Sequence, residues 1–134
     1  MITSDKMVRQ LESVLLTKWL KKFHREKTQW KRVRLGVAAD PEEARMFSVT
    51  LRWADAIFLD EGFVNIVETK LKADPKAIGQ LEMYKRLFPV TPEFSQFKDW
   101  PIRLILVAPN LDLAVAEMAS DKGIIYDVFK PEGF

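Results

Sequence analysis

The chain has 134 residues, of which 48% are apolar and 30% are charged, and its formal net charge is +2. This composition is typical of a folded globular domain and not of a disordered chain. The sequence contains no cysteine and one histidine, His24, so disulfides and thiolate zinc sites are excluded and any bound metal would be a hard cation such as Mg²⁺ or Mn²⁺.

No membrane-spanning or targeting segment is recognisable. No apolar run approaches the roughly 20 residues that cross a bilayer. Residues 1–10 lack the apolar segment of a signal peptide. We therefore expect one domain over residues 1–134, located in the cytoplasm and without membrane contact.

The first predicted element is a helix over residues 4–23, with Thr3, Ser4 and Asp5 as candidate N-caps. At the helical repeat of about 3.6 residues, an apolar stripe runs along one side of this helix, formed by Val8, Leu11, Leu15, Trp19 and Phe23. Glu12 falls inside the stripe, where the pattern calls for an apolar residue. Glu12 is therefore either a functional acid, part of a buried polar network, or the partner of an arginine.

A basic stretch follows the middle of this helix. Residues 18–34 carry eight lysines and arginines against one acid, Glu26. Such a stretch could contact nucleic-acid phosphates, or it could be a solvated helix face that runs into an exposed strand. Under the first interpretation the nucleic-acid-binding residues are Lys21, Lys22, Arg25, Lys27, Lys31, Arg32 and Arg34.

The remaining elements alternate between strands and helices. Strands are predicted at residues 30–37, 44–59, 63–71, 102–109 and 124–129, with a polar break at 38–44 and a bend possible within 44–59. Helices are predicted at residues 74–88 and 110–122. Asp74 and Pro75 supply the N-cap and first residue of the earlier helix. The order α-β-β-β-α-β-α-β predicts an α/β fold in which a mixed sheet is flanked by helices.

Residues 89–101 form a connection bounded by prolines and containing three aromatic residues, Phe94, Phe97 and Trp100. We expect these rings to pack beneath the connection as part of the core. A dimer contact and a surface on which unpaired bases stack are the alternatives.

Residues 51–72 read as a hairpin that places charges among its most apolar residues. If residues 61–62 form a two-residue turn, counting back from the turn places Asp55 opposite Glu68. Facing side chains in an antiparallel pair lie roughly 5 Å apart, and Lys70 follows Glu68 on the same face. Two carboxylates this close resist burial unless a cation lies between them. The hairpin therefore predicts a divalent metal site beside a lysine.

This set of groups suits phosphodiester hydrolysis. A divalent metal polarises a phosphate and helps to generate hydroxide from bound water. Lys70 would orient or activate that water, or stabilise the charge that develops on the phosphate. A structural salt bridge on a half-exposed sheet is the alternative explanation of the same residues.

The order Asp55, a spacer, then Glu68-Thr69-Lys70 resembles the PD-(D/E)XK nuclease superfamily, although Ala54 stands where the signature has proline. The resemblance implies a restriction-endonuclease-like fold with an α-β-β-β-α-β core, to which this chain adds a C-terminal α-β unit. It also implies an Mg²⁺-dependent nuclease related to archaeal Holliday-junction resolvases and RecB-type exonucleases.

Gln80 and Tyr84 on the following helix are similar to the Q-x-x-x-Y element of RecB-like members, and residues four apart share a helix face. Glu12 lies where many members place a further metal-binding acid. The resemblance thus implies a catalytic group of Asp55, Glu68, Lys70, Gln80 and Tyr84, and metal ligands from Glu12, Asp55, Glu68 and the carbonyl of Thr69. For Tyr84, core packing is the competing explanation.

The implied function is hydrolysis of DNA by metal-activated water, directed by DNA structure or ends and not by sequence. The implied partner is DNA, and a homodimer would supply two sites for paired cuts. Two alternatives stay open: a non-catalytic nucleic-acid-binding or assembly subunit of the same fold, and a structural α/β protein without a nucleic-acid role. A pure binding module, however, has no need of two facing carboxylates near phosphate.

Overall fold

The computed structural model describes residues 4–37 and 52–134, so Thr3, the predicted break at 38–44 and the first part of the strand predicted at 44–59 lie outside the described residues. Three α-helices are described: α1 (Asp5–Phe23), α3 (Pro75–Leu87) and α4 (Leu113–Asp121). The strands are β1 (Gln29–Leu35), β2 (Arg52–Asp60), β3 (Phe63–Thr69), β4 (Ile102–Ala108) and β5 (Ile125–Val128). The sequence predicted every one of these elements.

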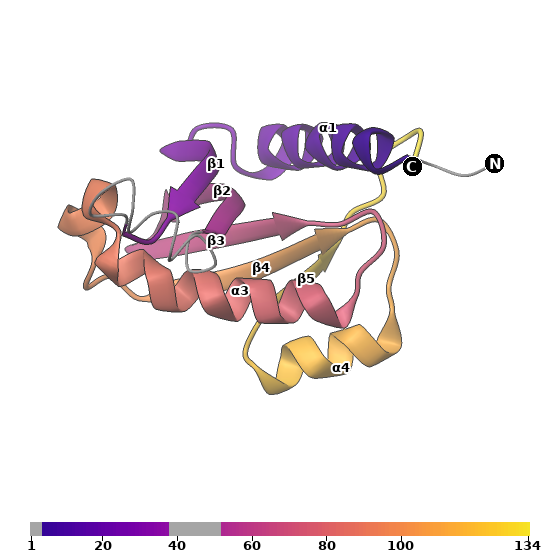
Figure 1. Ribbon diagram of the computed structural model, residues 1–134. Helices are drawn as coiled ribbons and strands as arrows, with labels where there is room; N and C mark the ends of the chain where they lie inside the picture. The colour runs from indigo at the N-terminus through magenta and orange to yellow at the C-terminus, as the bar shows by residue number, and fades with distance from the viewer. Residues whose placement is uncertain (1–3, 38–51) are drawn as a thin grey trace.

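The five strands form one mixed sheet in the order β1-β2-β3-β4-β5. The first three strands pair antiparallel, and β3, β4 and β5 pair parallel. Helix α1 covers one face of the sheet, and α3 and α4 cover the other (Figure 1). The predicted α/β fold with a mixed sheet between helices is therefore confirmed. None of the described helices combines the length and hydropathy that crossing a membrane requires.

A two-residue turn joins β2 to β3, as predicted. Glu61 and Gly62 both have left-handed backbone conformations, with φ of 53° and 79°, as the tight turns favoured in hairpins require. The pairing runs from Asp60 with Phe63 to Ala56 with Val67. Continued by one residue, this register sets position 55 opposite position 68.

Helix α1 begins after Ser4, whose side chain accepts a hydrogen bond from the Met7 N–H at 3.1 Å. The apolar stripe predicted for this helix is only partly correct. Leu11 is 37% exposed and Phe23 is 48% exposed. The buried positions are Leu15, Leu16, Trp19 and Leu20. The helix thus packs on the sheet through its C-terminal half, and its buried side is rotated from the predicted stripe toward Leu16 and Leu20.

The sheet separates two clusters of buried residues. The α1-side core is the set Leu16, Trp19, Leu20, Ala56, Phe58, Val67, Ile105 and Val107. The α3-side core lies on the other face and includes Val33, Leu35, Ala54, Ile57, Val64, Ile66, Leu81, Tyr84 and Phe88. The connection after α3 contains two short 3₁₀ helices, Phe88–Val90 and Pro92–Phe97. Its Phe94 is buried in the α3-side core, and Phe97 and Trp100 pack against that core, as expected.

Near the middle of the β1–β2 pairing, the alternation of side chains between the two faces of the sheet shifts by one residue in both strands. Trp30 and Val33, three residues apart, both pack on the α3-side core, as do Ala54 and Ile57. The pairing offset is unchanged across this point, since Lys31 pairs with Ala56 and Val33 with Ala54. The change of face therefore needs no inserted residue, and it occurs where Arg32 lies opposite Asp55.

A candidate active site between α1 and the hairpin

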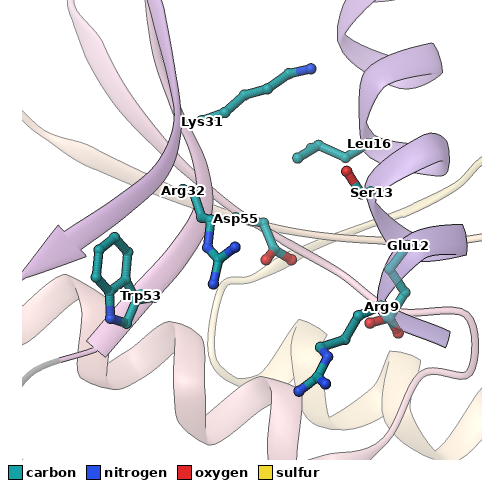
Figure 2. Close-up of a pocket in the computed structure, with 8 residues that line it drawn as sticks. All are labelled: Arg9, Glu12, Ser13, Leu16, Lys31, Arg32, Trp53 and Asp55. Atoms are coloured by element: carbon teal, nitrogen blue, oxygen red, sulfur yellow. The ribbon is translucent and has the colours of Figure 1, made fainter. Parts of the chain in front are cut away.

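A depression of about 670 Å³ lies between α1 and the two strands β1 and β2. Its lining residues are Arg9, Glu12, Ser13 and Leu16 from α1, Lys31 and Arg32 from β1, and Trp53 and Asp55 from β2. Figure 2 shows the charged ends of Arg9, Glu12, Arg32 and Asp55 directed into the shared space, while Lys31 reaches toward the helix. The depression thus combines two acids with three basic side chains and one indole ring.

Asp55 and Glu68 are neighbours, as the hairpin register predicts. The two carboxyl groups lie close enough for Asp55 to act on Glu68, and Oδ2 of Asp55 accepts the N–H of Thr69 at 2.7 Å. Glu68 is only 7% exposed. Burial, and then the adjacent charge of Asp55, raise the pKa of Glu68 well above its usual range. Burial beside Asp55 therefore disfavours the charged form of Glu68, and a cation between the two acids would reverse that effect.

Lys70 lies close enough to the acids to act on them electrostatically. Its ammonium lowers the pKa of both Glu12 and Glu68, against the larger effect of burial. Its backbone N–H donates to the Val107 carbonyl at 2.9 Å, which fixes the end of β3 against β4. The predicted acid-acid-lysine set is thus assembled in one place.

Glu12 has a structural partner that the sequence did not reveal. Its Oε2 accepts the N–H of Leu71 at 2.9 Å, so it ties α1 to the segment after β3. Burial raises the pKa of Glu12. Within residues 4–37 and 52–134, no group of three or more acidic or histidine side chains is arranged to hold a metal. The structure therefore does not bring Glu12 into one ligand group with Asp55 and Glu68.

Tyr84 and Gln80 lie on one face of α3, the helix that packs against β2, β3 and β4. The Tyr84 hydroxyl is 2.5 Å from Oε2 of Glu68 and 2.9 Å from the Trp53 carbonyl oxygen, and it joins β2 to β3. Tyr84 also belongs to the α3-side core, so core packing and contact with the site both hold for it. The buried Oε1 of Gln80 and Oγ1 of Thr69 have no hydrogen-bond partner among the described residues.

The donor set suits a hard divalent cation. Mg²⁺ typically binds proteins through one or two carboxylates and keeps several of its waters. Asp55 and Glu68 supply two carboxylates, and the Thr69 carbonyl is the backbone donor that the sequence analysis adds. The Thr69 hydroxyl and the Gln80 amide oxygen have no hydrogen-bond partner among the described residues. Each could therefore form a hydrogen bond to a water near the cation.

The predicted nucleic-acid-binding residues have different environments. Lys21, Lys22 and Arg25 are exposed on and just after α1. Lys31 lines the site and also donates to the Thr17 hydroxyl at 2.8 Å. Arg32 lines the site, and Arg34 is exposed on β1.

Lys27 is committed to another partner. Its Nζ forms a salt bridge with Asp60 at 2.9 Å and lies 3.0 Å from Nδ1 of His24. The positive charge of Lys27 is thus largely neutralised within the protein by Asp60. Arg9 and Lys130, which the sequence analysis left out, line the same surfaces, together with Lys18, the first residue of the basic stretch.

The fold resembles that of solved endonuclease structures. The chain is similar to a repair endonuclease from Pyrococcus abyssi, with 18% identity and a TM-score of 0.58 over 88% of this chain. It is also similar to EndoMS in the EndoMS–dsDNA2 complex (17% identity, TM-score 0.56, 92% of this chain) and in its apo form (16%, 0.54, 89%). In each case it covers 46% of the other chain.

At these identities the likeness establishes a shared fold, and this chain spans about half the length of each of those proteins. No family model and no curated protein matches the sequence.

Proposed function

We propose that this protein is an Mg²⁺- or Mn²⁺-dependent nuclease of the PD-(D/E)XK type that hydrolyses DNA phosphodiester bonds. The observation that carries the proposal is the placement of Asp55 opposite Glu68 and close to Lys70, at the edge of a basic depression. The shared fold with repair endonucleases, one of them in complex with dsDNA, supports DNA as the substrate.

Each residue of the site has a proposed role. Asp55, Glu68 and the Thr69 carbonyl would hold the cation, which supplies polarisation of the phosphate and a water of lowered pKa. Lys70 orients that water or stabilises the charge on the phosphate. Tyr84 positions Glu68 through its hydroxyl, and Glu12 positions the chain after β3 through Leu71.

A connected series of basic depressions supports binding to the DNA backbone. Lys31 belongs both to the site and to a second depression of about 530 Å³. Lys21 and Arg25 belong to that depression and to a third one of about 520 Å³, which Lys18, Lys22 and Lys130 also line. Contacts of this kind to phosphates position a nucleic acid without reading its sequence, which supports selection by DNA structure or ends.

The test is cleavage of labelled DNA with Mg²⁺, Mn²⁺ or EDTA. A four-way junction, a blunt duplex, a flap and a single strand would be compared. We expect metal-dependent cutting that is lost in Asp55→Asn, Glu68→Gln and Lys70→Ala. Glu117→Gln and Lys98→Ala are matched charge controls, because both residues are exposed elsewhere on the molecule, and they should cut normally.

Binding without cutting would contradict the nuclease proposal. If DNA is bound equally with and without metal and no substrate is cut, the chain is a non-catalytic binding or assembly subunit. The absence of a three-acid group among the described residues is the observation that favours this second candidate.

We also propose that two copies associate when the protein acts. A domain of this size encloses little of a long substrate, and a two-fold pair would place two sites for paired cuts. Light scattering of the protein with and without DNA tests this proposal, and a monomer under both conditions would overturn it.

A further inference from the structure

Trp53 is placed unlike the other tryptophans of the protein. It is 55% exposed, whereas Trp19 is 1% exposed and Trp30 and Trp100 are partly buried against the core. Exposed indole rings are uncommon, since tryptophan is highly buried on average. Trp53 lies two residues before Asp55 on β2, and both side chains line the same depression. An open aromatic ring thus stands beside a proposed metal ligand.

Strand β1 pairs with β2 beside Trp53. One of its residues, Arg32, has a strained backbone and places its guanidinium near the Trp53 ring. Arg32 has a φ of 55°, a left-handed conformation that is strained for a residue other than glycine. Successive residues of a regular strand point to opposite faces, yet Lys31 and Arg32 line the same depression. The guanidinium carbon of Arg32 is 5.8 Å from the centre of the Trp53 ring, within cation–π range.

We propose that Trp53 is a stacking surface for an unpaired base of the DNA strand whose phosphate lies at Asp55, an inference that rests on the proposed function. The depression holds an aromatic ring (Trp53), three cationic side chains and the carboxylate of Asp55, which match the parts of a single nucleotide: base, phosphate and scissile bond. Two residues along a strand span about 7 Å, which is within the reach of one nucleotide.

This assignment selects a class of substrate. In a continuous duplex both faces of each base are covered by neighbouring base pairs, so no face is free to stack on Trp53. Single strands, flaps and frayed ends offer such a face. Stacking of a base on an aromatic side chain contributes about 1–3 kcal/mol per base and tolerates any base. The site therefore favours DNA with an unpaired base over intact duplex.

The experiment is titration of tryptophan fluorescence with DNA in Ca²⁺, under conditions where cutting is not required. A short single strand is compared with a long duplex that has no unpaired loop, using the wild type, Trp53→Phe, Trp53→Ala and the control Trp100→Phe. We expect the single strand to quench the wild type and Trp100→Phe, and the quenching to be lost in Trp53→Phe. Trp53→Ala should bind the single strand about 5- to 150-fold more weakly and the duplex unchanged.

Quenching that persists in Trp53→Phe, or equal weakening of single-strand and duplex binding in Trp53→Ala, would overturn the inference. Because the readout is binding, it is separate from the test of catalysis. Cutting without dependence on Trp53 would retain the nuclease and reject the stacking surface. Stacking without cutting would reject the nuclease and retain Trp53 as a base-binding residue.

Discussion

The Tyr84 hydroxyl contacts both strands that carry the proposed metal ligands, through Glu68 on β3 and the Trp53 carbonyl on β2. Replacing it in Tyr84→Phe keeps the ring in the core and removes the contacts to Glu68 and to the Trp53 carbonyl. We expect the free energy of unfolding to fall by about 1 kcal/mol, measured by urea denaturation, and the rate of cutting to fall because Glu68 is less firmly positioned.

Tyr126→Phe is the matched control for that substitution. Its hydroxyl also bonds to backbone, with Asn110 and Asp112, but on an exposed surface at β5, three strands away from β2. It should leave cutting unchanged. If both variants behaved alike in the cutting assay, the role given to Tyr84 would be wrong.

His24 makes stability depend on pH below neutrality. Burial, and then the Lys27 ammonium, lower the pKa of His24. As the pH falls through about 6.5, the usual histidine pKa, the unfolded chain takes up a proton before the folded one does. His24 therefore contributes stability above that pH, and the contribution is lost as the pH falls toward the folded-state pKa.

The measurement is denaturant unfolding between pH 7.5 and about 5, for the wild type and for His24→Gln, whose side chain keeps a polar partner for Lys27 but does not titrate. The free energy of unfolding should fall less steeply with decreasing pH in the variant. Taking the difference between the two proteins removes the contribution of the carboxylates. Parallel pH curves would show that the pKa of His24 is not lowered.

At the residue scale, what the sequence could predict depended on local geometry. The pairing of Asp55 with Glu68 follows from a two-residue turn and from the strand period of two residues. Both features can be predicted from the sequence. The partner of Lys27 is Asp60, 33 residues away, and no local pattern links the two positions. The hydrogen bond from the Leu71 N–H to Glu12 also joins positions that no local pattern links. Lys27 was assigned to DNA binding from its charge alone.

At the scale of the element, the hairpin turn contains backbone strain that a single substitution can relieve. Glu61 has a left-handed φ of 53°, where asparagine is favoured and Asn-Gly is the preferred pair for such a turn. We expect Glu61→Asn to raise the free energy of unfolding by up to about 1 kcal/mol without affecting cutting. Thermal or urea unfolding measures the gain.

Glu61→Gln is the control, because it removes the same charge and the weak contact with Arg103 at 3.8 Å but has no preference for the left-handed region. A gain of equal size in Glu61→Gln would attribute the effect to charge and not to backbone conformation.

At this scale the sequence analysis succeeded where apolar periodicity and turn residues agree, as in β3 and α3. It did not foresee the exchange of faces in β1 and β2, because a left-handed arginine has no sequence signature comparable to glycine. It also described the connection after α3 only as a loop, since the two 3₁₀ turns within it are held by the packing of Phe88 and Phe94.

At the scale of the whole molecule, the basic depressions predict a strong dependence of DNA binding on salt. Each phosphate contact contributes about 0.9 to the slope of log K against log salt on duplex DNA and about 0.7 on single strands. Replacing both Lys21 and Arg25 by alanine should reduce the slope by between about 1 and 2, measured by fluorescence anisotropy over a series of salt concentrations.

The matched control replaces Lys85 and Arg86 by alanine. These residues are exposed on α3, on the opposite face of the sheet (Figure 1), and their loss changes the net charge by the same amount. If both double variants lowered the slope equally, binding would follow overall charge and not the depressions beside α1.

The order and pairing of the elements were the most predictable features of the molecule, because buried parallel strands must be continuously apolar and hairpin strands must follow their turn. The packing of α1 was less predictable. Its contacts with the sheet join segments that lie far apart in the chain, and its amphipathic pattern alone did not set its rotation on the sheet.

The first helix and the last strand are linked by one hydrogen bond: Nε1 of Trp19 donates to Oδ2 of Asp127 at 2.8 Å, across 108 positions of sequence. During synthesis the chain emerges from its N-terminus, so α1 leaves the ribosome long before Asp127 does. Residues of β4 that pack against α1, such as Ile105 and Val107, also arrive late. The wall of the depression that carries Arg9 and Glu12 is therefore fixed in place last, and we expect a nascent chain to complete the proposed site only as synthesis of this domain ends.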